Sequence, residues 1–445
     1  MGDRAKAVEL DPRLPRFVDL LRLRAFSVLY AAEAQSVAGD QLARIALAVL
    51  VFDRTGSAAA TSLTYATTFL PAILGGVVLA RIGDRLPRRA VMVGCDLVRA
   101  SLFVAMALPG LPLWSLAALL VVAVFLGPAF SASQVSYLAS ALTSEQFRTA
   151  TGVRMVTNQA AQVAGFAVGG VLVGVLQPRG ALLVDAATYV LSAVVIGALL
   201  RTAAAGSRSP GDSSAASKDT ANRAFAGLWR DRQVRVLIAL SALAGFFVVP
   251  EGLAVPFGDD IAASTTVTGL LLAAIPLGGA VGAVLLVRLV PKRRRRQVAG
   301  WMAIACGVPL IVTALRPPWP VALVAWFVSG ALAAYQIEIM TSVVQLIPDR
   351  LRSHLVGVTS AVLLGAQGLG LIVFGAVGEW SSPGIGIALA GAVGSLLACW
   401  TVHRLRGVTG AETRHAATPR HRAGNRKLGA VASHSTGYGG KLEKK

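Results

Sequence analysis

The sequence predicts an all-α integral membrane protein in which twelve transmembrane helices form two similar six-helix bundles. Of its 445 residues 55% are hydrophobic and only 14% are charged, whereas a soluble domain of this size needs more charge to cover its surface. A bilayer core roughly 30 Å thick requires about 20 apolar residues in a helix. Twelve such stretches are predicted at 26–52, 59–81, 89–109, 112–133, 151–176, 180–201, 235–256, 268–290, 297–315, 319–342, 354–377 and 384–404.

The segments between these stretches define the expected domains. The first stretch follows Arg22 and Arg24 and is succeeded by further spans, so it is not a cleaved signal peptide. The longest break is rich in Ser, Ala and Gly and becomes amphipathic at 222–235, which indicates a surface helix. The domains are a cytoplasmic N-terminal segment (1–25), a first bundle (26–202), a cytoplasmic linker (203–234), a second bundle (235–405) and a basic, disordered cytoplasmic tail (406–445).

Positive charge alternates from loop to loop. The net charge of +20 would suggest nucleic acid in a soluble protein, but cytoplasmic loops of membrane proteins also accumulate Lys and Arg. If the N-terminus is inside, the inner loops carry many cations and the outer loops carry only Arg54, Arg179 and Arg316, beside several acids. This pattern predicts an inner or plasma membrane location with both termini in the cytoplasm and no nucleic-acid partner.

The two halves of the chain resemble each other. Arg88-Arg89 falls on Arg295-Arg296 at an offset of 207 residues, and Ala161-Gln162 falls on Ala366-Gln367 at an offset of 205. Six helices repeated in the same sense give a pseudo-two-fold axis along the membrane normal, as in two-bundle transporters. The duplication favours a transporter over a receptor or a membrane enzyme.

The loop after the second stretch carries an acid followed by three cations, Asp84, Arg85, Arg88 and Arg89. Such a cluster is expected to latch the two bundles on the cytoplasmic side, the alternative being ordinary positive-inside charge. The segment resembles the signature loop of the major facilitator superfamily, Gly-x-x-x-Asp-Arg-x-Gly-Arg-Arg. Ala80 and Pro87 replace its two glycines.

The wider sequence resembles the twelve-helix drug:proton antiporter branch of that superfamily, which includes macrolide-efflux and siderophore-export proteins. The resemblance covers nearly all of residues 20–405. It implies a proton gradient as the energy source, no cofactor, and a mid-membrane substrate cavity between the bundles. The matching pieces are Gly39-Asp40, Asp96-Leu97-Val98-Arg99, Asp185-Ala186-Ala187-Thr188-Tyr189, Pro250-Glu251 and Gln345-Leu346-Ile347-Pro348-Asp349.

Helix five carries small residues at Gly165, Gly169 and Gly170, a spacing that lets helix backbones approach closely. The segment resembles the antiporter motif, although Phe166 stands where that motif has proline. Plain helix packing is the alternative interpretation.

Charges inside the first stretch are the sharpest candidates for proton coupling, because an ion near the bilayer centre costs at least about 2.5–3.5 kcal/mol. Glu33, Asp40 and Arg44 are spaced seven and four residues apart, so they share one helix face. We expect an Asp40–Arg44 pair, with protonation of Asp40 releasing Arg44. A static ion pair that only fixes packing is the alternative.

Further polar residues lie within later stretches. Glu251 and Glu338 are proton-carrier or cation-binding candidates, because burial disfavours a charged carboxylate; snorkelling to water is the alternative. Asp96 and Arg99 are expected to brace the signature loop. Candidates for the substrate cavity, or for interhelical hydrogen bonds, are Asn158, Gln162, Gln336 and Gln367.

The sequence therefore predicts proton-coupled efflux of a small amphipathic molecule by a monomeric transporter, and not an enzyme. No phosphate-binding loop, metal-ligand spacing or nucleophile triad is expected. An importer or siderophore-type exporter of the same fold remains an alternative. So does a non-transporting membrane sensor or assembly protein, which would bind its partners through the linker or the tail.

Overall fold

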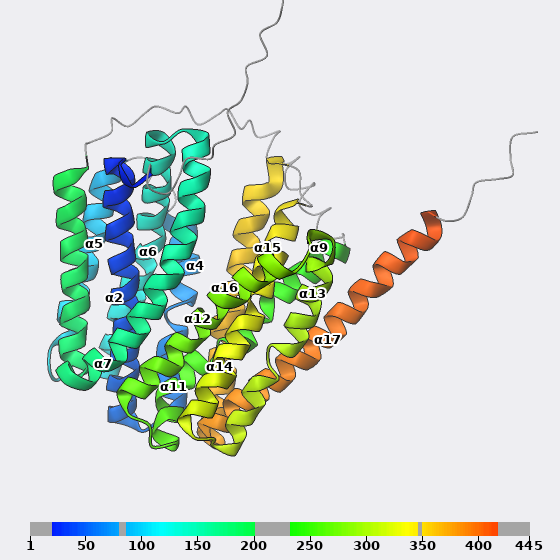
Figure 1. The fold of residues 1–445 in the computed structure, drawn as a ribbon. Coiled ribbons are helices and arrows are strands. Elements are labelled where there is room, and N and C mark those ends of the chain that lie inside the picture. Colours follow the sequence, from blue (N-terminus) through cyan, green and yellow to red (C-terminus); the bar gives the residue numbers. More distant parts are fainter. Residues whose placement is uncertain (1–19, 80–85, 201–231, 346–348, 417–445) are drawn as a thin grey trace, which may run out of the picture.

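The computed structural model describes residues 20–79, 86–200, 232–345 and 349–416, and every regular element in these ranges is a helix. Figure 1 shows the first and second halves of the chain as two groups of helices side by side. Ten helices within the described ranges are long and apolar enough to cross a membrane. One of them reverses at Gln177, and α3 and α4 together form another span, so the twelve predicted spans are all present.

The first half contains two departures from straight helices. The longest element doubles back at Gln177, which has a φ of 62° and is followed by Pro178, so it comprises the two antiparallel spans predicted around this point. The predicted helix 59–81 is interrupted at Thr67–Phe69, where the hydroxyls of Thr67 and Thr68 bond backbone carbonyls of the preceding turn. The helices are α2 (Arg24–Thr55), α3 (Ala58–Ala66), α4 (Leu70–Leu79), α5 (Arg88–Ala107), α6 (Leu113–Ala141) and α7 (Ser144–Leu199).

The second half contains more interruptions. Pro250 and Pro309 each stand in the first turn of a new segment, where the missing N–H of proline is tolerated. The predicted span 235–256 is therefore three helices, and 297–315 ends in a 3₁₀ turn. The elements are α9 (Arg232–Ala242), α10 (Ala244–Phe247), α11 (Val249–Asp260), α12 (Thr265–Leu289), α13 (Lys292–Ala305), η1 (Pro309–Leu315), α14 (Trp319–Ala333), α15 (Tyr335–Gln345), α16 (Asp349–Trp380) and α17 (Pro383–Ala416).

The molecule has two ends, which are named the lower end and the upper end from their places in Figure 1. The lower end in Figure 1 carries the connections at Gly56, Gln177 and Arg316, and the upper end carries the gaps after residues 79, 200 and 345. Several helices extend at the upper end past their apolar stretches, since polar residues with good helix propensity continue them. The helix α17 reaches Ala416 and so extends past the predicted tail boundary at 406, although this stretch includes Gly407 and Gly410. Residues 1–19 of the predicted N-terminal segment (1–25) and residues 203–231 of the predicted linker (203–234) lie outside the described residues.

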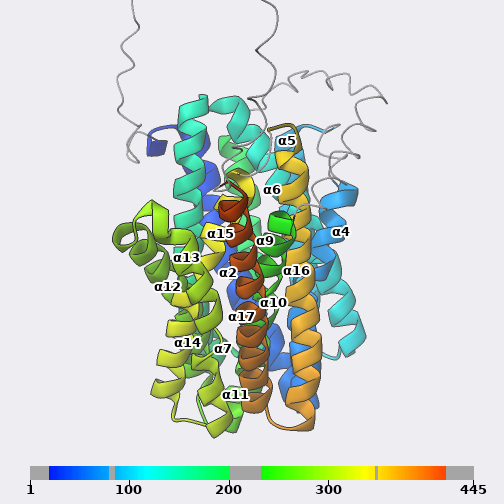
Figure 2. The same cartoon turned by 90° about the vertical axis from the view of Figure 1, so that its right-hand side faces the viewer.

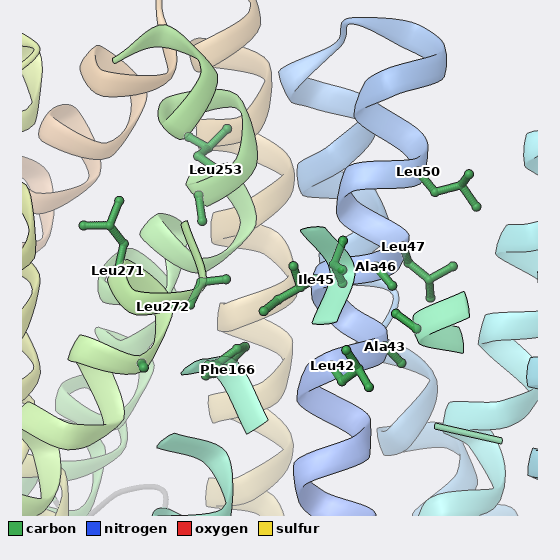
Figure 3. Close-up of a cluster of buried hydrophobic side chains, with 14 of the residues drawn as sticks. Leu42, Ala43, Ile45, Ala46, Leu47, Leu50, Phe166, Leu253, Leu271 and Leu272 are labelled. Carbon is green, nitrogen blue, oxygen red and sulfur yellow. The ribbon is translucent and has the colours of Figure 1, made fainter. Parts of the chain in front are cut away.

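The halves join through an apolar core. Figure 3 shows Ile45 of α2 and Phe166 of α7 beside Leu253 and Leu272 of α11 and α12, all fully or almost fully buried. Figure 1 shows the halves meeting at the lower end and diverging towards the upper end. Figure 2 shows α17 packed between α16 and α13 in the second half.

The helices α7 and α12 make a close approach between the halves. A Cβ atom on Gly170 would lie 2.7 Å from Gly269 Cα, so these two backbones touch. Gly165 and Gly169 pack against α2 in the same way, at Ala38 and Leu42. The three glycines singled out in the sequence therefore make helix-packing contacts.

Candidate functional site

A cavity of about 320 Å³ lies inside the first half, between α2, α4, α5 and α6. Glu33, Asp40 and Arg44 all line it, so they share a helix face, as their spacing predicts. Phe103 and Phe130 contribute apolar surface, and volumes of 300–1,000 Å³ are typical of small-molecule pockets. Four ionisable groups line this cavity, Arg99 of α5 being the fourth.

Asp40 is bonded from two other helices. Arg99 of α5 donates from Nη2 to its Oδ1 atom over 3.2 Å, and the Tyr189 hydroxyl of α7 donates to the same oxygen. The Arg99 guanidinium also lies 4.2 Å above the ring of Tyr189. These three side chains form one unit that joins three helices beside the cavity.

The expected Asp40–Arg44 ion pair is wrong, because the carboxylate is turned towards α5 and α7. Arg44 instead lies 5.6 Å from the ring centroids of both Tyr65 and Phe69. It donates to the Gln41 side-chain oxygen over 3.3 Å. Its charge lies over two aromatic faces, a cation–π arrangement, and within the electrostatic reach of Glu251 and Asp40.

Glu33 belongs to a separate and fully bonded network. Arg154 donates from Nε to both of its carboxylate oxygens over 2.7 Å, and Gln134 and Asn158 donate over 2.9 Å each. Arg154 also donates to the Gln134 side-chain oxygen over 3.1 Å. Because all its acceptor positions are engaged, Glu33 fixes the packing of α2, α6 and α7.

Two further acids lie behind Asp40. Asp96 is 1% exposed and accepts the Ser192 hydroxyl over 2.6 Å, and Asp185 is fully buried. Arg99 is the partner of Asp40 and Asp96 bonds Ser192 of α7, whereas residues 80–85 of the signature loop that they were expected to brace lie outside the described residues.

Half of the signature loop lies outside the described residues, including Asp84 and Arg85. The two described arginines of this motif bond backbone carbonyls of their own half. Arg88 donates to Ser136 O over 3.0 Å and to Ser140 Oγ over 3.1 Å, and Arg89 donates to Gly197 O.

The two predicted acids of the second half differ in their surroundings. Glu251 accepts the Tyr65 hydroxyl over 3.0 Å, and this bond links α11 of one half to α3 of the other. Glu338 is half-buried in the first turn of α15 and has no hydrogen-bond partner among the described residues.

The predicted cavity residues do not line the cavity described above. Asn158 bonds Glu33, and Gln336 donates to Ser241 O over 3.4 Å and to Tyr335 Oη over 2.8 Å. These are the interhelical hydrogen bonds of the alternative interpretation. Gln162 and Gln367 are half-buried on α7 and α16.

Several site residues were missed from the sequence. Arg154 was not singled out because it stands near the start of a predicted span, where a cation is common. Tyr65 carries no pattern that separates it from other aromatic residues, and Tyr189 was noted only as part of a piece that resembles the family, without a role of its own. Asp185 did carry a signal, since an acid in the middle of an apolar stretch is rare in membrane helices.

Comparisons with known proteins agree with the fold. The family model of the Major Facilitator Superfamily matches residues 29–257 and 248–434. The multidrug efflux pump Tap of Mycobacterium tuberculosis is 27% identical over 369 residues, covering 79% of this chain and 86% of the pump.

Solved structures of low sequence identity share the architecture. The nucleoside transporter NupG superposes with a TM-score of 0.69 at 13% identity, covering 85% of this chain and 98% of the other. A bacterial homologue of the human lysosomal transporter Spinster, in an inward-facing and occupied conformation, gives a TM-score of 0.67 at 16% identity. That alignment covers 86% of this chain and 94% of the other.

Proposed function

This chain belongs to the Major Facilitator Superfamily, and we propose that it exports a small amphipathic molecule in exchange for protons by alternating access. The observation that carries the proposal is the unit of Asp40, Arg99 and Tyr189 on the cavity wall. A carboxylate placed there is reached by solutes of the cavity and is also tied to two other helices. Its protonation state therefore influences both ligand binding and helix packing.

Protonation of Asp40 removes the negative charge that holds Arg99. The guanidinium then interacts more strongly with the remaining acids, Asp96 and Asp185, which lie within its electrostatic reach. A ligand or proton shifts a conformational equilibrium only through a difference in affinity between the two states. In this proposal the strength of the Asp40–Arg99 pair differs between the two states and supplies that difference.

The orientation in the membrane follows from charge. Described residues of the upper end include Arg88, Arg89 and the run from Lys292 to Arg296, whereas the lower end carries Asp53 and Glu379. By the positive-inside rule the upper end is cytoplasmic, in the inner or plasma membrane. The halves diverge towards that end, so the conformation is inward-facing.

The direction of transport is supported by the relative named as a multidrug efflux pump, which aligns with most of this chain. The energetics are sufficient without ATP. A potential of 100 mV contributes roughly 2.3 kcal/mol per charge, and about 1.4 kcal/mol corresponds to a tenfold ratio. One charge per cycle therefore supports roughly fifty-fold accumulation.

The test is Asp40→Asn in proteoliposomes, with substrate found by a drug-susceptibility panel in cells that overexpress the protein. An imposed proton gradient is expected to drive substrate flux in wild type but not in the variant, while substrate exchange without a gradient persists. Asp53→Asn, at an exposed position near the end of the same helix, is the matched control. Gradient-driven flux that is unchanged in Asp40→Asn refutes the coupling role, and uptake into cells would refute efflux.

A further inference from the structure

Asp185 is a fully buried acid to which the proposed transport cycle assigns no proton. It lies in the second arm of α7 and packs directly on α2, where a Cβ atom on Gly39 would collide with its Oδ1 atom. Gly39 directly precedes Asp40 in α2. The carboxyl groups of Asp40 and Asp185 therefore lie at the same turn of α2. Asp40 faces the cavity and Asp185 lies behind it.

The hydrogen bonds of Thr188 indicate the protonation state of Asp185. The Thr188 hydroxyl donates to the backbone oxygen of Asp185 over 2.8 Å, and the same hydroxyl oxygen lies 3.2 Å from Asp185 Oδ1. A hydroxyl group has one hydrogen to donate. If Asp185 is ionised, the two oxygens must share that one hydrogen; if Asp185 is protonated, its carboxyl group can donate to Thr188 Oγ1 and both contacts are complete.

The other carboxyl oxygen of Asp185 supports the same assignment. Its Oδ2 atom is buried without a hydrogen-bond partner among the described residues. An ionised carboxylate carries about four acceptor positions and requires donors when it is removed from water. Burying a neutral carboxyl group that donates one hydrogen bond costs less free energy than burying an ionised carboxylate at the same place.

The charges around Asp185 are unbalanced if all acids are ionised. Asp40 on α2, Asp96 on α5 and Asp185 on α7 all lie within the electrostatic reach of Arg99, and Arg44 also acts on Asp40. Asp40 accepts two strong donors. Asp96 accepts the Ser192 hydroxyl over 2.6 Å, although its Oδ1 atom, like Oδ2 of Asp185, is buried without a partner among the described residues. Asp185 has the longer 3.2 Å contact with Thr188 Oγ1, and Glu33 is paired with Arg154. Asp185 is thus the acid with the weakest support for a negative charge.

We infer that Asp185 is a second proton-binding site, protonated in this conformation, which exchanges its proton with Asp40 during the cycle. In this exchange the O–H bond of Asp185 breaks and an O–H bond forms on the Asp40 carboxylate. Asp185 becomes the anion. Arg99, which was the counter-ion of Asp40, becomes the counter-ion of Asp185. The exchange step rests on the proposed function, whereas the protonation of Asp185 in the resting protein does not.

Infrared spectroscopy of the full chain in liposomes tests the inference without transport. The carbonyl stretch of protonated carboxyl groups is measured at neutral pH in H₂O and again in D₂O. Exchange of the carboxyl proton for deuterium shifts this band and so identifies it. A component of this band is expected to disappear in Asp185→Asn and to persist in Asp96→Asn. A band that is identical in wild type and Asp185→Asn overturns the inference.

A second variant serves if Asp185→Asn does not fold. Thr188→Val preserves the shape of the side chain and removes the acceptor, so the carbonyl stretch is expected to move to higher frequency. Ser192→Ala, which removes the donor to Asp96, is the matched control and is expected to leave this component in place. An unshifted component in Thr188→Val overturns the assignment of the proton to the Asp185–Thr188 contact.

A third measurement separates this inference from the proposed function. The rate of proton-driven substrate flux is expected to be lower in Asp185→Asn than in wild type, while substrate exchange without a gradient persists; an unchanged proton-driven rate would overturn the exchange step. If wild type shows no proton-driven flux, the proposed function fails. The infrared measurement still tests the protonation of Asp185, because it does not depend on transport.

Discussion

Adding one methyl group at Gly170 should open the lower end of the molecule. A Cβ atom at this position would lie 2.7 Å from Gly269 Cα and 2.8 Å from Thr265 O, both backbone atoms of α12. Ordinary contact begins near 3.4 Å, so α7 and α12 must separate by about 0.7 Å, the difference between the two distances. No side chain can rotate away to relieve this overlap, because the obstructing atoms are backbone.

The expected magnitude follows from the free energy of overpacking. Extra atoms in a packed interface cost about 1–3 kcal/mol, which corresponds to a roughly 5- to 150-fold change in an equilibrium between two states. Only the state in which α7 and α12 touch at this point bears that strain. Gly170→Ala is therefore expected to raise the population in which the lower end is open.

Distances between spin labels at the lower end measure this population. Cysteines at Thr55 and Ser381, both exposed and on opposite halves, carry the labels in a background in which Cys399 is serine. Gly170→Ala should add a longer distance to the distribution. Gly174→Ala is the matched control, because its Cβ atom would meet nothing closer than 4.0 Å. Identical distributions for wild type and Gly170→Ala refute the reasoning.

Three further predictions concern single side chains. Tyr65→Phe removes the hydroxyl that bonds Glu251 across the halves and is expected to lower stability by about 1–3 kcal/mol in thermal unfolding, whereas Glu251→Gln keeps an acceptor oxygen and should have a smaller effect. Arg154→Met leaves its buried carboxylate partner unpaired, with an expected loss of about 3–5 kcal/mol; Arg316→Met breaks an exposed ion pair and should cost about 1 kcal/mol or less, so equal losses would contradict this account. Cysteine substituted at Arg316 should react with an impermeant maleimide in intact cells, and cysteine at Lys292 should react only after permeabilisation; the reverse pattern would contradict the orientation.

The span positions could be predicted from the sequence because hydropathy and helix length depend on local composition alone. The breaks within spans were harder to foresee. The helix break at Leu243 lies two residues before Gly245, whose backbone packs on that of α16 at Ala366, a contact that no local pattern encodes. Helix ends at the upper face extended past the apolar residues for the opposite reason, since helix propensity continues where hydropathy stops.

The candidate site could be predicted only in part. Spacing placed Glu33, Asp40 and Arg44 on one face, which is a property of a single helix. Pairing between helices depends on their rotation and depth, and these are set by packing across the bundle. The partner of Asp40 was therefore assigned within α2, whereas Arg99 reaches it from α5.

The interruption at Thr67–Phe69 has a mechanical consequence for the whole molecule. Below it, α3 packs on α11 and α16 of the opposite half; above it, α4 packs mainly on α6 of its own half. One span is thereby divided between the two halves, and Thr68 at the break lines the cavity. If the bundles rock as proposed, the chain is expected to bend at this break, so that the first half does not pivot as a rigid block.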